Sequence, residues 1–329
     1  MARVGTGPAG TPLWFDEPAA GAPGGGCRTY GGVAVRGGHE RISVLMPARD
    51  AAATVEAAVR TTLRALPRES QLLVHDDASS DGTGAVLASV EDPRLRVLRS
   101  DSARGVAGGL NHLLEQVDSD VVARMDADDV CLPWRFALQL RALRAGADVV
   151  FSTVVGTGDV GRAPVRVAPP LPLPADAFAL HLLVANPVAH STMLGRTDVL
   201  RGAGGYRPAP AEDYDLWLRL AAAGHRLTRI GTPCVLYRFH GGQLTASADW
   251  AQRSASDPAL REAYAALSQH LLGREPVWYG DLRGDGVGED GPARIEQFTR
   301  AVTTAARDLP ALQRRFLTAK LQRLPGRAP

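Results

Sequence analysis

Residues 42–77 read ISVLMPARDAAATVEAAVRTTLRALPRESQLLVHDD, and this stretch decides the fold. Ile42–Met46 is a short apolar run ended by Pro47, a pattern typical of a buried strand. Apolar residues then recur at helical spacing within Ala51–Leu66, and a second apolar run, Leu72–Val74, ends in His-Asp-Asp. The stretch therefore predicts a strand, a helix and a second strand, which is the repeating unit of a parallel sheet.

The alternation of strand and helix continues to about residue 154. Further strands are expected at Leu95–Leu98, Val121–Met125 and Asp148–Val154, with helices after residue 82, at Gly105–Val117 and at Pro133–Leu143. Loops of a few residues join these elements, so the sequence predicts an α/β fold, a mainly parallel sheet flanked by helices on both faces. In such sheets, ligands bind beyond the carboxyl ends of the strands.

The pattern weakens after Val155. Helices are predicted at Asp176–Val184 and Glu212–Ala223, and short strands near Val165–Val167, Ser191–Leu194 and Val235–Phe239. From about Ser247 onward the sequence predicts helices, broken by the Gly- and Asp-rich stretch 280–291.

The composition excludes several classes of protein. Of the 329 residues, 45% are hydrophobic and 22% are charged, so the chain can bury a core and is not wholly disordered. Its net charge of +2 argues against a dedicated nucleic-acid-binding protein. No apolar run approaches a membrane span, and the N-terminus lacks a signal pattern. Cys27, Cys131 and Cys234 have no metal-ligand spacing, which favours a reducing, intracellular setting.

The strongest chemical signal is Asp126-Ala127-Asp128-Asp129 at the end of an apolar strand. Carboxylates this close repel one another unless a cation shares the site. Carboxylate oxygens suit hard divalent ions such as Mg²⁺ and Mn²⁺, which bridge to substrate phosphates. From these residues alone, a metal site and a solvated acidic turn before the helix at Pro133 are equally acceptable.

Two further acidic segments are candidates. Asp76-Asp77 also ends a strand, where a carboxylate can accept hydrogen bonds from a nucleobase or ribose, although an Asx turn would use the same residues. Glu212-Asp213 begins a helix whose apolar face includes Leu216 and Trp217. Negative charge favours the start of a helix, and a carboxylate facing a cleft there could instead act as a general base.

Five segments together resemble the family 2 glycosyltransferases, which have a GT-A fold. They are Ile42–Pro47, His75–Thr83, Arg104-Gly105 with Asn111, Met125–Asp129 and Glu212–Arg219. The resemblance covers about Arg41–His240, with the segments in the family's order. It implies an inverting enzyme that moves a sugar from a nucleotide-diphosphate donor, expected to be a UDP-sugar, to an acceptor hydroxyl.

The resemblance also implies functions for particular residues. Asp126 and Asp128 match the family's DxD pair, which holds Mn²⁺ or Mg²⁺, with Asp128 as the better candidate for direct ligand. Asp213 matches the catalytic base, and Glu212 is its neighbour. The residues expected to bind the nucleotide sugar are Pro47, Ala48, Asp50, Asp77, Arg104, Asp126, Arg238 and His240. Among them, Asp77 would accept a hydrogen bond from the base.

Two other functions stay open at this point. A sugar-1-phosphate nucleotidyltransferase uses a similar sheet but needs a Gly-rich, basic phosphate loop, and the stretch after Met46 lacks one. A non-catalytic nucleotide-sugar-binding protein would not need its carboxylates, yet Asp126, Asp128 and Asp213 are all present.

The predicted domain organisation has three parts. A flexible leader at 1–38 precedes a catalytic domain at 39–246, whose nucleotide-sugar-binding half is 39–130 and whose acceptor half is 131–246; a helical extension occupies 247–329. Residues 299–329 hold seven basic side chains and only Asp308 as an acid. A helix packed on the catalytic domain is the favoured interpretation, with peripheral contact to anionic lipid as the alternative. The expected partners are the donor and a saccharide, glycolipid or small-molecule acceptor, and the expected location is cytoplasmic, with peripheral contact at the inner membrane face as the alternative.

Overall fold

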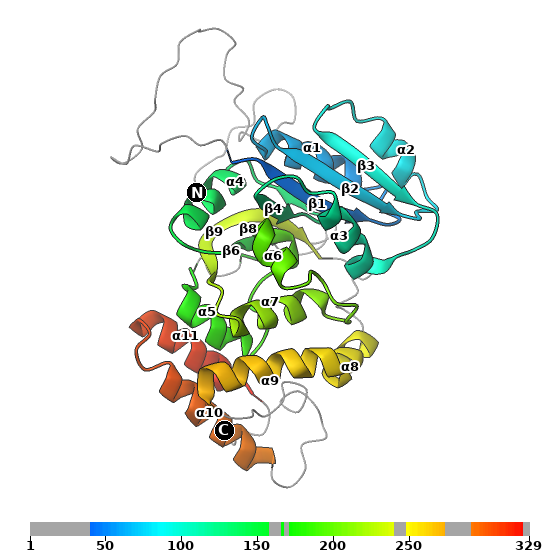
Figure 1. Cartoon of the computed structure of the whole chain (residues 1–329). Helices are drawn as coiled ribbons and strands as arrows, with labels where there is room; N and C mark the ends of the chain where they lie inside the picture. Colours follow the sequence, from blue (N-terminus) through cyan, green and yellow to red (C-terminus); the bar gives the residue numbers. More distant parts are fainter. Residues whose placement is uncertain (1–39, 158–165, 168–170, 240–247, 274–290, 325–329) are drawn as a thin grey trace, which may run out of the picture. The chain divides into compact units, whose positions relative to one another are not determined.

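The computed structural model describes residues 40–157, 166–167, 171–239, 248–273 and 291–324 (Figure 1). The predicted leader at 1–38, with Cys27, and the candidate site residue His240 lie outside the described residues. Residues 39–329 form one structural unit.

The described strands form one sheet in the order β3, β2, β1, β4, β8, β6, β9 and β5, with β7 beside β6. Their bounds are β1 (Ile42–Ala48), β2 (Gln71–Asp77), β3 (Leu95–Ser100), β4 (Val121–Arg124), β5 (Val130–Cys131), β6 (Val149–Thr157), β7 (Arg166–Val167), β8 (Leu194–Arg196) and β9 (Leu227–Arg238). Neighbours among β3, β2, β1 and β4 are parallel, as are β6 and β9. The antiparallel β8 joins β4 to β6, and β5 and β7 are also antiparallel to their partners. The predicted mainly parallel sheet is confirmed for its first half, and the second half is mixed.

Helices cover both faces of the sheet, as predicted. They are α1 (Val55–Ala65), α2 (Thr83–Ala88), α3 (Gly105–Glu115), α4 (Arg135–Arg144), α5 (Ala175–Leu182), α6 (Thr197–Gly202), α7 (Glu212–Ala222), α8 (Ala248–Ser256), α9 (Pro258–Leu272), α10 (Gly291–Ala305) and α11 (Ala311–Leu321). Side chains alternate along β1: Val44 and Met46 enter the core that α1 and α4 cover, whereas Leu45 enters the core that α3 and α7 cover. Because both faces are buried, β1 is apolar except for Ser43, whose hydroxyl accepts hydrogen bonds from Gln71 and Ser119.

The C-terminal helices pack onto the second of these cores. Ile295, Phe298 and Val302 of α10 are buried together with residues of α5, α7 and α9, and Figure 1 shows α9, α10 and α11 grouped beside α5 and α7. The interpretation of this region as packed helices is therefore confirmed for these positions, while Leu312 at the start of α11 is half exposed.

Local boundaries differ from the sequence-based expectation in several places. The strand expected near Val235–Phe239 begins at Leu227, as β9, and the short elements α6 and β5 were not expected. The helix expected from Ala51 begins only at Val55, because Asp50 has a left-handed φ of 47° and residues 51–54 form a turn. The strand expected at Ser191–Leu194 is a 3₁₀ turn at His190–Thr192, and β8 begins after it. The Thr192 hydroxyl closes that turn by donating to the Ala189 carbonyl at 2.7 Å.

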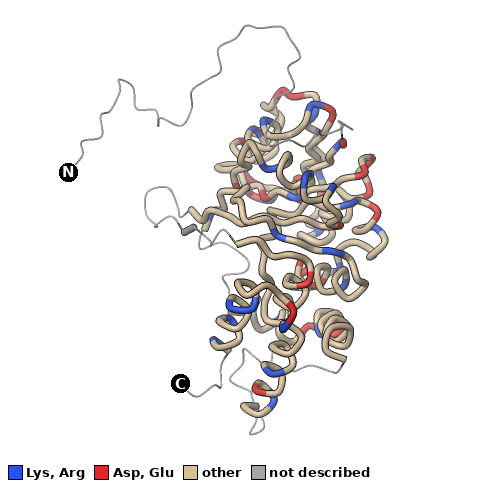
Figure 2. The backbone as a smooth tube through the Cα atoms, turned by 90° about the vertical axis from the view of Figure 1, so that its left-hand side faces the viewer, with Lys and Arg blue, Asp and Glu red and all other residues tan. Residues whose placement is uncertain are grey.

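Figure 2 shows acidic and basic residues along most of the described backbone. The C-terminal residues 299–324 are an exception, since they hold six basic side chains and Asp308 as their one acid. Within the described residues, every helix is too short or too polar to cross a membrane.

Candidate active site

The candidate residues occur where parallel strands end. β1, β2 and β4 end at Ala48, Asp77 and Arg124, and because parallel strands point the same way, these ends share one edge of the sheet. Here Ala48 is buried, Pro47 is partly exposed and Asp50 is exposed.

The loop after β1 is tied to the loop after β2. The Ser80 backbone N–H donates to Asp50 Oδ1 at 2.9 Å, and the Asp50 N–H donates to Ser79 Oγ at 3.0 Å. These bonds hold Asp50 in its left-handed conformation, which an aspartate adopts more easily than most residues. The two loops therefore form one rigid edge.

Asp77 fixes the start of α3. Its two carboxylate oxygens accept the backbone N–H groups of Arg104 and Gly105 at 2.6 and 3.0 Å. Gly105 has a φ of 70°, so a side chain there would be strained. The Arg104 side chain lies beside Ser100, where its Nε donates to the hydroxyl at 3.0 Å. The carboxylate of Asp77 thus has a structural function that the sequence did not predict, and its contact with a base stays a prediction.

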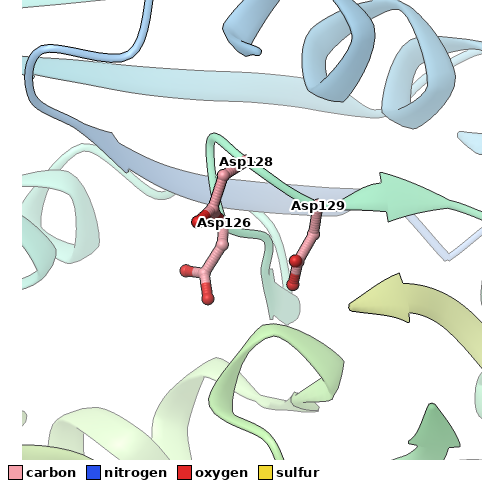
Figure 3. A group of neighbouring side chains, drawn as sticks. All are labelled: Asp126, Asp128 and Asp129. Atoms are coloured by element: carbon pink, nitrogen blue, oxygen red, sulfur yellow. The ribbon is translucent and has the colours of Figure 1, made fainter. Parts of the chain in front are cut away.

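Asp126, Asp128 and Asp129 form a compact carboxylate group, called here the acidic group. One oxygen of each side chain lies within 4.8 Å of the others, and Figure 3 shows all three side chains extending from the turn between β4 and β5. Asp129 is 1% exposed. Burial, with the nearby charge of Asp128, raises the pKa of Asp129 to about 6, although the Arg238 N–H favours its ionised form. The three hard oxygen donors fit a divalent cation.

Arg124 is a site residue that sequence analysis missed. It is 6% exposed at the end of β4 and forms an ion pair with Asp126. Its Nε has no hydrogen-bond partner in the described structure. The backbone carbonyl of Arg124 is held by Arg135, which donates to it at 2.6 Å. The available signal was a lone arginine in an otherwise apolar strand, directly before the acidic group.

Glu212 and Asp213 stand at the start of α7. Both are partly buried, and burial is the main reason that the pKa of each carboxyl is raised. Asn186 Nδ2 donates to Asp213 Oδ2 at 2.9 Å, a bond that favours the ionised form and holds the side chain in place. The result is an oriented carboxylate with raised proton affinity, which is the property that a general base requires.

His190 lies beside this pair as a neutral group. Its Nδ1 is 3.5 Å from Glu212 Oε1, and its Nε2 shares a hydrogen bond with the Tyr206 hydroxyl at 3.1 Å. Burial lowers the pKa of His190 well below its ordinary value, so its contact with Glu212 is polar rather than ionic. The ring also packs edge-on against Trp217 at 5.7 Å between centroids. Trp217 itself is fully buried, as expected of a core residue.

Arg124 and Tyr237 connect the acidic group to the start of α7. The charge of Arg124 lowers the pKa of both Asp129 and Glu212. The pKa of Tyr237 is raised to about 12, first by burial and then by the charges of Asp129, Asp128 and Asp213. The two carboxylate groups, 83 or more residues apart in sequence, therefore lie near the same arginine and the same tyrosine.

The end of β9 closes this site. The Arg238 backbone N–H donates to Asp129 Oδ1, and its Nε donates to the Asp128 carbonyl, both at 3.0 Å. Arg238 thus supports the acidic turn directly. The sequence predicted Arg238 to bind the nucleotide sugar, and that contact stays a prediction.

Comparisons with known proteins agree with this geometry. The model of glycosyl transferase family 2 matches residues 43–200. The amylovoran biosynthesis glycosyltransferase AmsE of Erwinia amylovora is 31% identical over 175 residues, which are 52% of this chain and 64% of AmsE. WfaP of Escherichia coli, a UDP-Glc:α-D-GlcNAc-diphosphoundecaprenol β-1,3-glucosyltransferase, is 24% identical over 211 residues, 63% of this chain and 81% of WfaP.

A solved structure extends the likeness to the fold. Residues 1–349 of S. aureus TarS in complex with UDP-GlcNAc superpose with a TM-score of 0.56 at 16% identity, covering 85% of this chain and 88% of TarS 1–349. The GT-A fold expected from the resemblance is confirmed by this likeness. The relatives are glycosyltransferases, and neither the nucleotidyltransferase nor the non-catalytic alternative finds support among them.

Proposed function

The chain belongs to the family 2 glycosyltransferases, and on that basis we propose that it transfers a sugar, with inversion, from a UDP-sugar to an acceptor hydroxyl. The observation that carries the proposal is the pairing of the acidic group with an oriented, partly buried Asp213 in one site. WfaP and TarS support UDP as the donor nucleotide, because their names give UDP-Glc and UDP-GlcNAc.

Asp128 and Asp126 would hold Mn²⁺ or Mg²⁺ at the diphosphate. A divalent cation there neutralises charge on the leaving nucleotide when it is bound. The carboxylates fit such an ion by chemistry and spacing. Arg124 pairs with Asp126 and so balances part of the negative charge in the protein itself. Arg238 holds the turn in place from β9.

Asp213 would act as general base. Its carboxylate accepts the proton of the acceptor hydroxyl while that oxygen bonds to the anomeric carbon, and the bond from this carbon to the diphosphate breaks. Attack from the face opposite the leaving group inverts the configuration. Asn186 orients the carboxylate, and the charge of Glu212 raises the pKa of Asp213, which strengthens the base.

The proposed nucleoside site is the rigid edge formed by the loops after β1 and β2. Pro47, Ala48 and Asp50 border it from β1, Asp77 borders it from β2, and Arg104 borders it from the start of α3, where its N–H bonds to Asp77. His240 is also predicted to bind the nucleotide sugar, and it lies outside the described residues.

The proposed acceptor is a saccharide or a glycolipid. WfaP supports a glycolipid, since its name specifies an acceptor sugar on a diphosphoundecaprenol. A cytoplasmic enzyme with peripheral membrane contact would suit such an acceptor. The basic residues of α10 and α11 are the proposed contact, and replacement of the exposed Arg300, Arg314 and Arg315 by alanine should then weaken binding to anionic liposomes.

The test of the proposed function is release of UDP from a panel of UDP-sugars in the presence of Mn²⁺. The wild-type chain should release UDP, and Asp128→Ala should lower the rate at least about 100-fold, the scale of lost electrostatic stabilisation. Asp308→Ala, at an exposed acid of the C-terminal region, is the matched control and should retain the wild-type rate. No release by the wild type, or equal release by Asp128→Ala, would contradict the proposal.

A further inference from the structure

Phe239 is a large apolar side chain that the fold leaves 42% exposed. Single exposed apolar residues are common and need no explanation by themselves. Trp134 is exposed to a similar degree. Phe239 differs because it directly follows Arg238, whose backbone and side chain both bond to the acidic turn.

The backbone around Phe239 is fixed. Its N–H donates to the Thr157 carbonyl of β6 at 2.7 Å, and the preceding residue donates to Asp129 Oδ1 at 3.0 Å. The backbone of Phe239 is therefore fixed one residue beyond the contact with the acidic group, so little of the backbone has to become ordered when a ligand arrives. An ordered aromatic surface loses little entropy on binding.

Phe239 forms an aromatic pair with Tyr237. The ring centroids are 5.1 Å apart at an interplanar angle of 66°. Tyr237 directly precedes Arg238, whose backbone N–H bonds to Asp129, and the charges of Asp129, Asp128 and Asp213 act on its phenol, so this ring lies near the acidic group. An edge-to-face contact covers only part of the Phe239 ring, which stays 42% exposed. The pair thus joins a half-buried ring near the acidic group to an exposed one.

We propose that Phe239, supported by Tyr237, is the surface on which a pyranose ring of the acceptor stacks. The inference rests on the proposed glycosyl transfer and deepens it by naming a saccharide acceptor. The C–H groups on one face of a pyranose carry partial positive charge, which suits the negative face of an aromatic ring. In the proposed function the donor sugar lies beside the diphosphate at the carboxylates, whereas the Phe239 ring is exposed to the solvent from which an acceptor enters.

The test is saturation-transfer NMR on the full chain with UDP and Mn²⁺, using methyl β-glycosides of glucose, galactose and N-acetylglucosamine as probes. Selective irradiation of aromatic protons should saturate the ring C–H protons of a bound glycoside. Phe239→Leu should lower this transfer and weaken glycoside binding about tenfold, the upper range for a lost aromatic contact. Phe239→Trp should keep both. Trp134→Leu, at an exposed aromatic elsewhere among the described residues, should match the wild type.

A second readout separates this inference from the proposed function. UDP release from the donor without acceptor should be equal in the wild type and Phe239→Leu, because the ring is assigned to the acceptor alone. Saturation transfer to the glycosides at the wild-type level in Phe239→Leu would overturn the inference. The inference would also be overturned if a wild-type chain that hydrolyses its donor gave no saturation transfer to any of the glycosides. A loss of donor hydrolysis in Phe239→Leu as large as its loss of glycoside binding would overturn it as well. Failure of the wild type to release UDP from any donor would instead contradict the proposed function.

Discussion

Replacement of Asp129 by asparagine is predicted to stabilise the metal-free folded state at neutral pH. Asp129 is 1% exposed, and burial raises its pKa from 3.8 to about 6. The folded chain therefore binds the proton more tightly than the unfolded chain does. Asparagine has a similar shape and can still accept the Arg238 N–H, but it carries no charge to bury.

The size and sign of the effect follow from the two pKa values. Below about pH 4 the carboxyl is protonated in both states, and its ionisation costs no stability. As pH rises from about 4 to 6 the unfolded state ionises first, so the folded state loses stability until both states are ionised. A difference of about two pKa units corresponds to about 3 kcal/mol. Asp129→Asn removes this loss.

The assay is urea unfolding in EDTA at several pH values between 4 and 8. The stability of Asp129→Asn minus that of the wild type should grow by about 3 kcal/mol over this range. Taking the difference cancels the titration of the other buried carboxyls. Asp308→Asn, at an exposed acid, corrects for the change in net charge.

Addition of Mn²⁺ provides the second half of the test. At pH 8 the wild type should gain about 2.7 kcal/mol when Mn²⁺ is present at 100 times its Kd, and Asp129→Asn should gain less. A difference between the two proteins that stays constant from pH 4 to 8 in EDTA would refute the reasoning, because the buried carboxyl would then cost nothing to ionise.

Three other changes have defined outcomes. Asn186→Ala removes a bond that favours ionised Asp213, so the acidic limb of a kcat/KM profile should move to higher pH, and an unmoved limb would exclude Asp213 as base. Arg124→Gln should lower turnover at least about tenfold in UDP-release assays while Arg124→Lys recovers part of it, since the buried cation offsets the acidic group. Gly205→Ala should lower the free energy of unfolding by about 2 kcal/mol in urea, because φ is 67° and the new Cβ would lie 2.6 Å from Asn111 Oδ1.

Sequence patterns predicted the parts of the fold that depend on local periodicity. The buried strands at Ile42 and Leu72 are short apolar runs, and the structure places them as parallel neighbours. The acidic group was also predictable from a local pattern, because its three carboxylates lie within four consecutive residues. In contrast, the antiparallel β8 is three residues long and follows a turn closed by Thr192, so no periodic signal marks it.

Residues that act through long-range contacts were not predictable. Asn186 is an ordinary loop residue in the sequence, and only the fold brings it 2.9 Å from Asp213. Asn111 belongs to a segment of the family resemblance, yet its function is seen only in the hydrogen bonds that it exchanges with Tyr206, 95 residues away. Asp77 illustrates the converse, because a carboxylate predicted to meet a ligand also holds the start of α3.

The position of the site follows from the order of the strands. The chain builds β1, β2 and β3 outward in one direction and then returns to place β4 on the other side of β1. β1 and β4 are therefore parallel neighbours, and their carboxyl ends meet at one edge of the sheet. Arg124 ends β4 at this point, and its guanidinium is buried against Asp126 while it also acts on Glu212. Carboxylates brought to this edge by the turn after β4 and by α7 repel each other, so a protein-borne cation there lets the site form before any metal binds.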